Sequence, residues 1–258
     1  MTIKRHLLAL LAALGFAGAA AASGGGIQWD RFPTDKLTDL PSLQHGAKLF
    51  VNHCLNCHAA AFMRFNRLRD IGLTDEEIRK NLIFTNAKVG DTMQVPLDPR
   101  QAKEWFGAVP PDLTLVARSR ADISKGSGSD YLYTYLRSYY RDPAKATGWN
   151  NLAFPDVAMP NVLWTLQGQR AAKYADQKDA HDPAKTVQVF AGFTQISPGT
   201  HSGAEFDETV ADLVAFMTWM AEPAQGLRVR LGVWVLLFMA LFTVVAWRMN
   251  AAFWKDIK

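Results

Sequence analysis

The residues that decide the fold are Val51-Asn52-His53-Cys54-Leu55-Asn56-Cys57-His58. They contain the pattern C-x-x-C-H, which is typical of covalent attachment of a c-type haem. If the stretch is helical, Cys54, Cys57 and His58 face one side, because residues three and four positions apart are neighbours on a helix. Two thiols on one side can form thioethers with the vinyl groups of one haem, and His58 can bind its iron. The sequence therefore predicts one haem c, bound through Cys54 and Cys57, with His58 as an iron ligand.

Two other kinds of site use cysteines at this spacing, a thioredoxin-like redox site and half of a zinc site. The chain has only two cysteines, so no second pair can complete a four-cysteine zinc site. No strand pattern precedes Cys54, as a thioredoxin-like fold requires. Haem attachment is therefore favoured over both alternatives.

The charge of the chain is unevenly distributed. The formal net charge is +4, but seven of the basic residues lie near the two ends. Residues 23–227 hold 21 basic and 23 acidic side chains, which gives this part a net charge of −2 before haem propionates are added. A nucleic-acid partner is therefore not predicted, and a basic protein is the partner that the charge favours.

Residues 1–22 have the pattern of a secretory signal peptide. Lys4 and Arg5 form its charged start, residues 7–16 are apolar, and Ala20-Ala21-Ala22 provides a small-residue cleavage site before Ser23. The alternative is an uncleaved anchor helix, but the apolar stretch is short for a membrane span. We expect cleavage before Ser23 and a periplasmic haem domain over residues 23–227.

A second apolar segment lies near the C-terminus. Residues 231–247 form an uncharged run, with Arg228 and Arg230 before it and Arg248 after it. A helix of this length approaches the thickness of a bilayer core, and flanking arginines can extend to the interfaces. We predict a transmembrane anchor over residues 228–248 and a cytoplasmic tail over residues 249–258. The alternative is a buried helix of a soluble domain.

Apolar periodicity predicts two longer helices in the domain, over residues 42–57 and 208–221. Thr74 and Glu77 have the spacing of a capping box and predict a short helix after Thr74. Residues 142–160 and 161–202 are expected to be rich in loops. Five of the six tyrosines are predicted to share another short helix, namely residues 131, 133, 135, 139 and 140.

The segment Pro110-Pro111-Asp112-Leu113 predicts an extended stretch followed by a helix. Asp112 is placed to cap that helix. Arg118 and Arg120 lie near its end, where their charge suits the helix dipole.

Taken together, these features resemble the cytochrome c1 family, the haem subunits of the cytochrome bc1 complex. The resemblance covers essentially the whole chain. It implies a mainly α, cytochrome c-type haem domain with long loop insertions and one C-terminal transmembrane helix. In such a domain the two longer helices would cross at Gly46, with Phe50 and Trp219 near the contact. The markers of the resemblance are Cys54-Leu55-Asn56-Cys57-His58, Pro110-Pro111-Asp112-Leu113, Ala158-Met159-Pro160 and Trp219-Met220-Ala221-Glu222-Pro223.

The resemblance implies that Met159 is the second axial ligand of the haem iron. A thioether is a soft, neutral donor that favours Fe(II), which suits an electron carrier. Met93 is the main competitor, because it also lies in a loop near a proline. Met217 and Met220 lie on a helical stripe and are expected to fill the core. Weaker alternatives are the histidines at positions 45, 53, 181 and 201.

The resemblance also implies that Arg120 and Tyr131 contact a haem propionate, since a guanidinium can bind a carboxylate through two hydrogen bonds. The alternative is that Arg118 or Arg120 only occupies a helix end. Pro110 and Pro111 are expected to border the haem. Some members of the family carry further cysteines and acidic docking segments, which are not evident here, so no docking face is predicted.

The implied function is electron transfer in a quinol–cytochrome c oxidoreductase of a bacterial inner membrane. Electrons would arrive from the Rieske iron–sulfur protein and leave to soluble cytochrome c, and cytochrome b would be a further partner. No catalytic residue is predicted, because the chain alone would convert no substrate. One alternative is a free-standing, membrane-anchored cytochrome c that shuttles electrons to a terminal oxidase. Another is a haem enzyme with an open sixth position.

Overall fold

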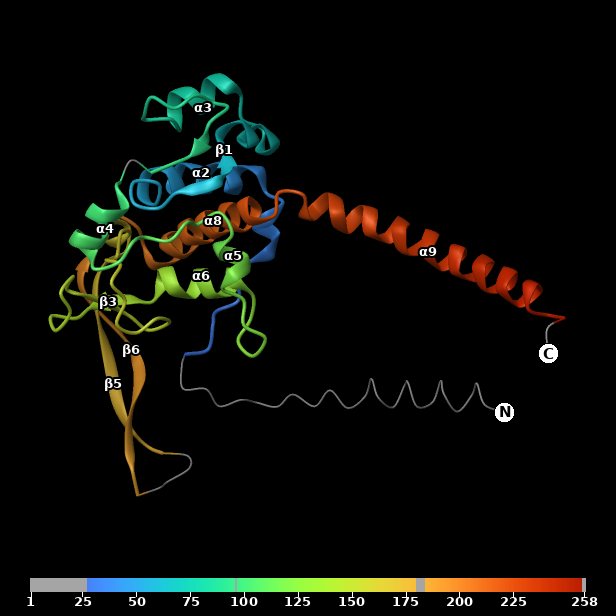
Figure 1. The fold of residues 1–258 in the computed structure, drawn as a ribbon. Helices are drawn as coiled ribbons and strands as arrows, with labels where there is room; N and C mark the ends of the chain where they lie inside the picture. Colours follow the sequence, from blue (N-terminus) through green and yellow to red (C-terminus); the bar gives the residue numbers. More distant parts are fainter. Residues whose placement is uncertain (1–26, 96, 180–183, 257–258) are drawn as a thin grey trace.

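The computed structural model describes residues 27–95, 97–179 and 184–256, so the predicted signal peptide lies outside the described residues. Helices dominate, and one long helix leaves the domain at its C-terminal end (Figure 1), so the predicted mainly α class is confirmed. The helices are η1 (Thr34–Leu37), α2 (Leu40–His53), η2 (Phe65–Ile71), α3 (Asp75–Asn81), α4 (Pro99–Phe106), α5 (Val116–Ser119), α6 (Gly128–Arg137), α7 (Trp164–Gln167), α8 (Gly203–Ala221) and α9 (Gln225–Phe253).

The strands of the described residues form three separate antiparallel pairs. The β5–β6 hairpin projects away from the helical core (Figure 1), so the expectation of loops over residues 161–202 is wrong for most of that range. Bulges after Gln169 and Lys173 interrupt the hairpin's register, and few of its side chains are buried, so no clean alternation marks it in the sequence. The pairs are β1 (Ala60–Arg64) with β2 (Thr92–Met93), β3 (Tyr139–Arg141) with β4 (Trp149–Asn151), and β5 (Gly168–Lys178) with β6 (Thr186–Pro198).

The core of the domain is the contact between α2 and α8. A Cβ atom built on Gly46 would lie only 2.1 Å from the Asp212 carbonyl oxygen and 2.7 Å from Phe216 Cβ. Phe50 packs against Phe216 with ring centroids 5.6 Å apart, and Trp219 lies 5.7 Å from Phe216. The predicted crossing at Gly46, with Phe50 and Trp219 near it, is therefore confirmed.

Both core helices have ends that differ from the prediction. α2 begins two residues early and ends at His53, so the C-x-x-C-H motif follows the helix instead of belonging to it. α8 begins at Gly203, because Ser202 and Glu205 form a capping box there. Apolar periodicity marks the buried part of a helix, and the first residues of α8 are exposed.

Two shorter helices show one correct and one wrong prediction. The capping box of Thr74 and Glu77 is present at the start of α3. The tyrosines do not share one helix, because α6 ends at Arg137 and the next pair, Tyr139 and Tyr140, lies in β3. The strand begins there because β4, which lies within the predicted loop 142–160, pairs with these residues.

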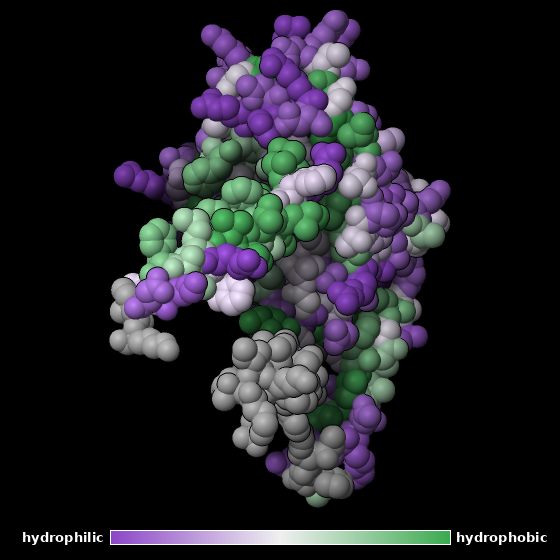
Figure 2. All heavy atoms as spheres, turned by 90° about the vertical axis from the view of Figure 1, so that its right-hand side faces the viewer, coloured by the Kyte–Doolittle hydropathy of each residue, from purple (hydrophilic) through white to green (hydrophobic). Residues whose placement is uncertain are grey.

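α9 is the one helix in the described residues that is long and apolar enough to cross a membrane. Its 29 residues would extend about 44 Å at about 1.5 Å each, which exceeds a bilayer core of about 30 Å. None of its residues is buried against the domain. Figure 2 views the molecule from the side on which α9 projects, and apolar residues form a band across the middle of that face. The helix contains the predicted span 228–248 and extends beyond it at both ends.

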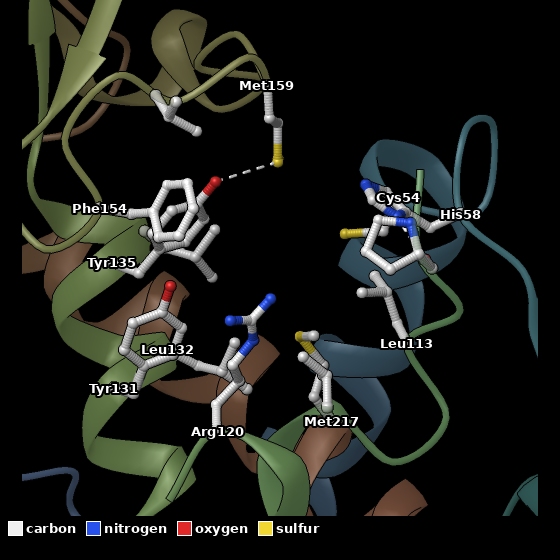
Figure 3. A pocket seen from close by; sticks show the side chains of 14 residues that line it. Cys54, His58, Leu113, Arg120, Tyr131, Leu132, Tyr135, Phe154, Met159 and Met217 are labelled. Atoms are coloured by element: carbon white, nitrogen blue, oxygen red, sulfur yellow. Dashed lines mark hydrogen bonds between the residues drawn. The ribbon is translucent and has the colours of Figure 1, made fainter. Parts of the chain in front are cut away.

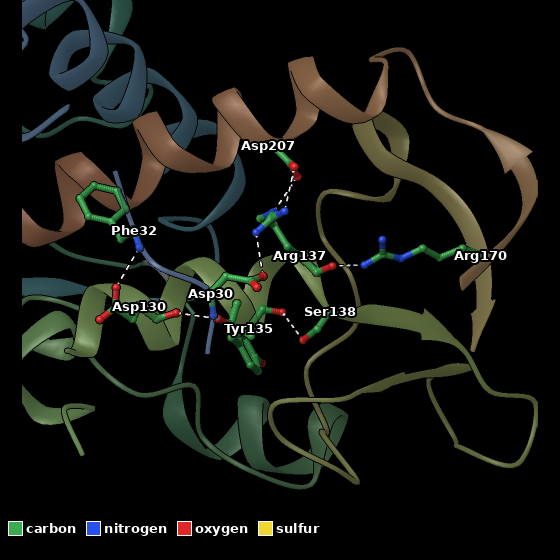
Figure 4. A network of polar contacts seen from close by, with 9 residues as sticks. Asp30, Phe32, Asp130, Tyr135, Arg137, Ser138, Arg170 and Asp207 are labelled. Carbon is green, nitrogen blue, oxygen red and sulfur yellow. Dashed lines mark hydrogen bonds and ion pairs between the residues drawn. The ribbon is translucent and has the colours of Figure 1, made fainter. Parts of the chain in front are cut away.

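Buried polar contacts hold the first described residues against α6 (Figure 4). Asp130 Oδ1 accepts a hydrogen bond from the Phe32 amide at 2.8 Å, and Oδ2 accepts one from the Ser127 amide at 2.9 Å. Thr134 Oγ1 accepts one from the Asp30 amide at 2.7 Å. Burial raises the pKa of Asp130, but the hydrogen bonds outweigh burial and leave this pKa below its ordinary value.

Replacing Gly46 with Leu is expected to lower the free energy of unfolding by about 2 kcal/mol or more, because α2 and α8 have no room for a side chain at the crossing. Denaturant unfolding of the full chain in detergent, followed by circular dichroism, measures this loss. Gly203→Leu is the control, because a Cβ on Gly203 meets no atom within 4 Å. Equal losses in the two variants would contradict the close crossing.

Asp130 is expected to make the free energy of unfolding depend on pH. Its pKa is lower in the folded chain than in the unfolded chain, so its carboxylate stabilises the fold at neutral pH. That contribution is lost as the pH falls from the ordinary value of 3.8 through the folded pKa.

Asp130→Asn should therefore lower the free energy of unfolding by about 1–3 kcal/mol at neutral pH. When the pH is lowered, the free energy of unfolding of this variant should fall less than that of the unchanged chain. Urea unfolding at about pH 7 and about pH 3 measures both effects. A variant that loses as much stability as the unchanged chain between those two pH values would refute the assignment.

Candidate haem site

The C-x-x-C-H motif forms a turn directly after α2. The amides of Cys57 and His58 both donate hydrogen bonds to the Cys54 carbonyl oxygen, at 3.1 and 2.9 Å. The turn places Cys54 and His58 beside one cavity (Figure 3). Cys54 is buried, Cys57 is partly buried, and neither forms a disulfide. Burial raises the pKa of the Cys54 thiol to about 12, with a smaller contribution from Cys57.

His58 has one ring nitrogen fixed by the backbone. Its Nδ1 lies 2.7 Å from the Pro111 carbonyl oxygen, and because a carbonyl oxygen can only accept, Nδ1 carries the proton. Nε2 then keeps the lone pair with which an imidazole binds a metal ion. Burial lowers the pKa of His58 more than the hydrogen bond to Pro111 raises it, which keeps the ring neutral.

Asp112 holds the segment that carries Pro111 beside the haem motif. Its Oδ2 accepts a hydrogen bond from the Ala61 amide at 2.7 Å, and its Oδ1 accepts one from the Thr114 amide at 2.9 Å. The prediction that Asp112 caps a helix is wrong, because α5 has no side-chain cap. The carboxylate instead joins two chain segments, and this contact keeps the Pro111 carbonyl near His58.

Two cavities, of about 150 and 320 Å³, lie between the haem motif and residues 152–160. Their walls are mainly apolar, and Pro110 lines the larger cavity. In Figure 3, Met159 projects into this space from a different side from Cys54 and His58. Both cavities are lined by His58, Pro111, Phe154, Val157 and Met159.

The candidate methionine ligands differ in position. Met159 is partly buried, and its Sδ accepts a hydrogen bond from the Tyr135 hydroxyl at 3.5 Å. Met93 is fully buried in β2 opposite Ala60 and lines neither cavity. Met217 belongs to the core, as expected, and also forms part of the cavity wall. The structure therefore brings Met159, and not Met93, to the same cavity as His58.

Of the histidines considered as alternative axial ligands, two of those described lie away from the haem cavities. His45 and His201 line a separate cavity beside Asp212. His53 lines the larger haem cavity, next to the motif itself. His181 lies outside the described residues.

Arg120 and Tyr131 meet at the smaller cavity. The guanidinium carbon of Arg120 lies 5.8 Å from the centre of the Tyr131 ring, and Figure 3 shows the guanidinium pointing into the cavity. Arg118 instead forms an ion pair with Glu222 at 2.5 Å. Within the described part of the chain no carboxylate pairs with Arg120, so its charge is available to an acidic group of a ligand.

Sequence reasoning missed several residues that enclose the cavity. Tyr135 lies four residues after Tyr131 on α6, and this spacing is a signal that both face the same space. Phe154 and Val157 lie in an irregular part of the chain, where no periodic pattern indicates which side chains face inward.

The residues present fit a c-type haem. Two thiols, a neutral imidazole and a thioether surround apolar space, and Nε2 of the imidazole is left for a metal ion. Beside this space lies the guanidinium of Arg120, which pairs with no carboxylate of the described residues. This is the donor set that covalent attachment and six-coordinate iron require.

The chain matches known proteins over nearly its whole length. A model of the Cytochrome C1 family matches residues 29–257. Cytochrome c1 of Allochromatium vinosum is 40% identical over 240 residues, which cover 93% of each chain. Cytochrome c1 of Rhodospirillum rubrum is 26% identical over 288 residues, which cover 99% of this chain and 98% of the relative.

A protein of Nitrosomonas europaea named ammonia monooxygenase gamma subunit is also similar. It is 42% identical over 255 residues, which cover 99% of this chain and 98% of that protein. The name denotes a different activity, but the family model and the cytochrome c1 relatives match the same residues of this chain, so the name does not alter the family. The chain belongs to the Cytochrome C1 family, the membrane-anchored haem subunits that transfer electrons in the cytochrome bc1 complex.

Proposed function

We propose that this chain holds one haem c through thioethers from Cys54 and Cys57, with His58 Nε2 and Met159 Sδ as the axial ligands. The observation that carries the proposal is that His58 and Met159, far apart in the sequence, line the same apolar cavity. The hydrogen bond from His58 Nδ1 to the Pro111 carbonyl oxygen supports it, because one ring nitrogen is left for iron.

This donor set suits electron transfer. When bound, the haem supplies one-electron exchange between ferric and ferrous iron. The side chains of the protein fill both axial positions and exclude water, and the thioether favours Fe(II) and so raises the potential. On this proposal the chain makes and breaks no bond in a substrate, and the quinol is oxidised in another subunit.

Arg120 and Tyr131 bind a propionate of the haem on this proposal. The guanidinium points into the cavity and has no carboxylate partner among the residues described, and it can offer two hydrogen bonds to a carboxylate. Pro110 and Pro111 border the haem on the side of His58, where both line the larger cavity.

The chain is exported and anchored in a bacterial inner membrane on this proposal. Residues 1–22 are the signal peptide, residues 23–227 the periplasmic haem domain, and residues 228–248 the transmembrane part of α9. Residues 249–258 are the cytoplasmic tail. The exposed apolar surface of α9 supports the anchor, since an unburied apolar helix of this length requires lipid or protein around it.

The partners follow from membership of the family. Cytochrome b lies beside α9 in the membrane, the Rieske iron–sulfur protein supplies electrons, and soluble cytochrome c accepts them. The small negative net charge of residues 23–227 supports a basic acceptor.

Met159→Leu is expected to remove the absorption band of the sulfur–iron bond, to lower the midpoint potential and to let carbon monoxide bind nearly all of the reduced haem. The reason is that leucine has no donor atom. Absorption spectra of the full complex, with and without carbon monoxide, measure these changes. Met93→Leu is the control, because Met93 is buried but lines neither cavity. Rapid carbon monoxide binding by the unchanged protein would refute the ligand assignment.

The full chain is expected to co-purify in mild detergent with b-type haem and a Rieske cluster. A redox-titrated absorption spectrum reports the c and b haems together, and electron paramagnetic resonance reports the cluster. Isolation of the chain with its c haem but without b haem would instead support a free-standing cytochrome.

A further inference from the structure

Tyr135 lines the smaller cavity, and its hydroxyl points toward the sulfur of Met159 (Figure 3). The same hydroxyl contacts the hydroxyl of a second tyrosine, Tyr139. Its oxygen is 3.5 Å from Met159 Sδ and 2.7 Å from the Tyr139 hydroxyl oxygen. Nothing in the function proposed above uses this contact.

The number of hydroxyl protons decides which group donates in each of the two hydrogen bonds. A phenol has one proton to donate, and a thioether sulfur can only accept. Tyr135 therefore donates to Met159 Sδ, and Tyr139 donates to the Tyr135 oxygen. The Tyr139 side chain is only 1% exposed, and its hydroxyl has no other partner in the described residues. The two hydroxyls form a chain that ends on the sulfur, and each bond polarises the next.

Asn151 fixes the relative positions of Tyr135 and the loop that carries Met159. Its Nδ2 donates to the Tyr135 carbonyl oxygen at 2.8 Å. Its Oδ1 accepts hydrogen bonds from the amides of Ala153 and Phe154, at 2.9 and 3.0 Å, where the loop begins. The end of α6, strand β4 and the start of the loop are thus joined through one buried side chain.

Arg170, at the base of the β5–β6 hairpin, fixes the backbone of Tyr139. Its Nε donates to the Tyr139 carbonyl oxygen at 2.9 Å, and its second guanidinium contact is the Arg137 carbonyl oxygen at the end of α6 (Figure 4). The backbone of each tyrosine is therefore fixed by a hydrogen bond, that of Tyr135 by Asn151 and that of Tyr139 by Arg170.

We propose that Tyr135 tunes the haem potential by donating a hydrogen bond to the axial sulfur of Met159. The proposal rests on the proposed role of Met159 as a ligand. A thioether sulfur has two lone pairs, so one can bind iron while the other accepts from Tyr135. The hydrogen bond draws electron density from the sulfur, which weakens its donation to Fe(III) more than to Fe(II). The reduced state is therefore favoured, and the potential rises.

A purely packing role for Tyr135 makes a different prediction. Its ring stacks on Tyr131 with centroids 5.7 Å apart and meets the Tyr139 ring edge to face at 5.3 Å. A phenylalanine would keep both ring contacts and lose only the hydroxyl. Tyr135→Phe therefore separates the hydrogen bond from the packing.

The experiment is a redox titration of the intact membrane complex carrying Tyr135→Phe. The ratio of reduced to oxidised haem at a fixed ambient potential is expected to fall about threefold, which corresponds to about 28 mV for a one-electron couple. Tyr139→Phe should shift the potential in the same direction by less, because it only removes polarisation of the Tyr135 hydroxyl. Tyr133→Phe is the matched control on α6, since its ring packs over Arg137 and lines neither cavity.

The spectrum of the same samples separates this proposal from the ligand assignment. A lower potential with the sulfur–iron band retained in Tyr135→Phe, and no shift in Tyr133→Phe, supports the tuning role. An unchanged potential, or an equal shift in Tyr133→Phe, overturns it while leaving Met159 as the ligand. Loss of the band in Tyr135→Phe also overturns it, because Tyr135 would then be needed only to place the loop. Absence of the band from the unchanged protein would instead refute Met159 as the ligand.

Discussion

The close approach of α2 and α8 at Gly46 is the constraint on which the haem site depends. Only a hydrogen atom fits between the two backbones there, and Phe50 then packs against Phe216 beside the crossing. The Cys54 amide donates to the Phe50 carbonyl oxygen at 2.8 Å, so the turn of the haem motif starts from a residue that the core already fixes. Little conformational entropy remains to be lost when the thiols and the imidazole of His58 are ordered.

The other side of the site is fixed by a different kind of contact. Met159 lies in an irregular segment, and its position depends on side-chain hydrogen bonds, chiefly those of Asn151, that join the segment to the end of α6. The turn that carries His58 follows directly from α2, and the Pro111 carbonyl oxygen fixes one nitrogen of its ring. Met159 is placed instead by residues of α6, β4 and its own loop. A cavity between two separately fixed units can keep its width when a haem iron held between them changes oxidation state.

This difference explains how much the sequence could predict. The capping box at Thr74 is a local pattern, and it indicated the correct local structure. The C-x-x-C-H spacing is also local and indicated the residues that gather at the cavity, but not the turn that carries them. Met159 could be named only by resemblance, because no local pattern expresses a contact with Tyr135. Asp112 was misjudged for the same reason: an aspartate before a helix predicts a cap, but its oxygens bind the Ala61 and Thr114 amides. The sequence did not predict the β5–β6 hairpin, because its exposed, bulged strands lack the alternation of apolar and polar residues that burial imposes.

The polar groups inside the site share one property, which is that almost all of them are neutral. His58 is a neutral imidazole, Met159 is a thioether, and burial raises the pKa of Tyr135 to about 12, so its phenol keeps its proton at neutral pH. Apolar walls and neutral donors stabilise a buried net positive charge poorly, which disfavours the oxidised iron. Arg120 is the one cation among the described residues that line the smaller cavity. It acts in the same direction, because its charge repels Fe(III) more than Fe(II) except where a propionate neutralises it. On the proposed ligation, burial, the thioether, the Tyr135 hydroxyl and any charge on Arg120 that no propionate neutralises therefore all favour the reduced state.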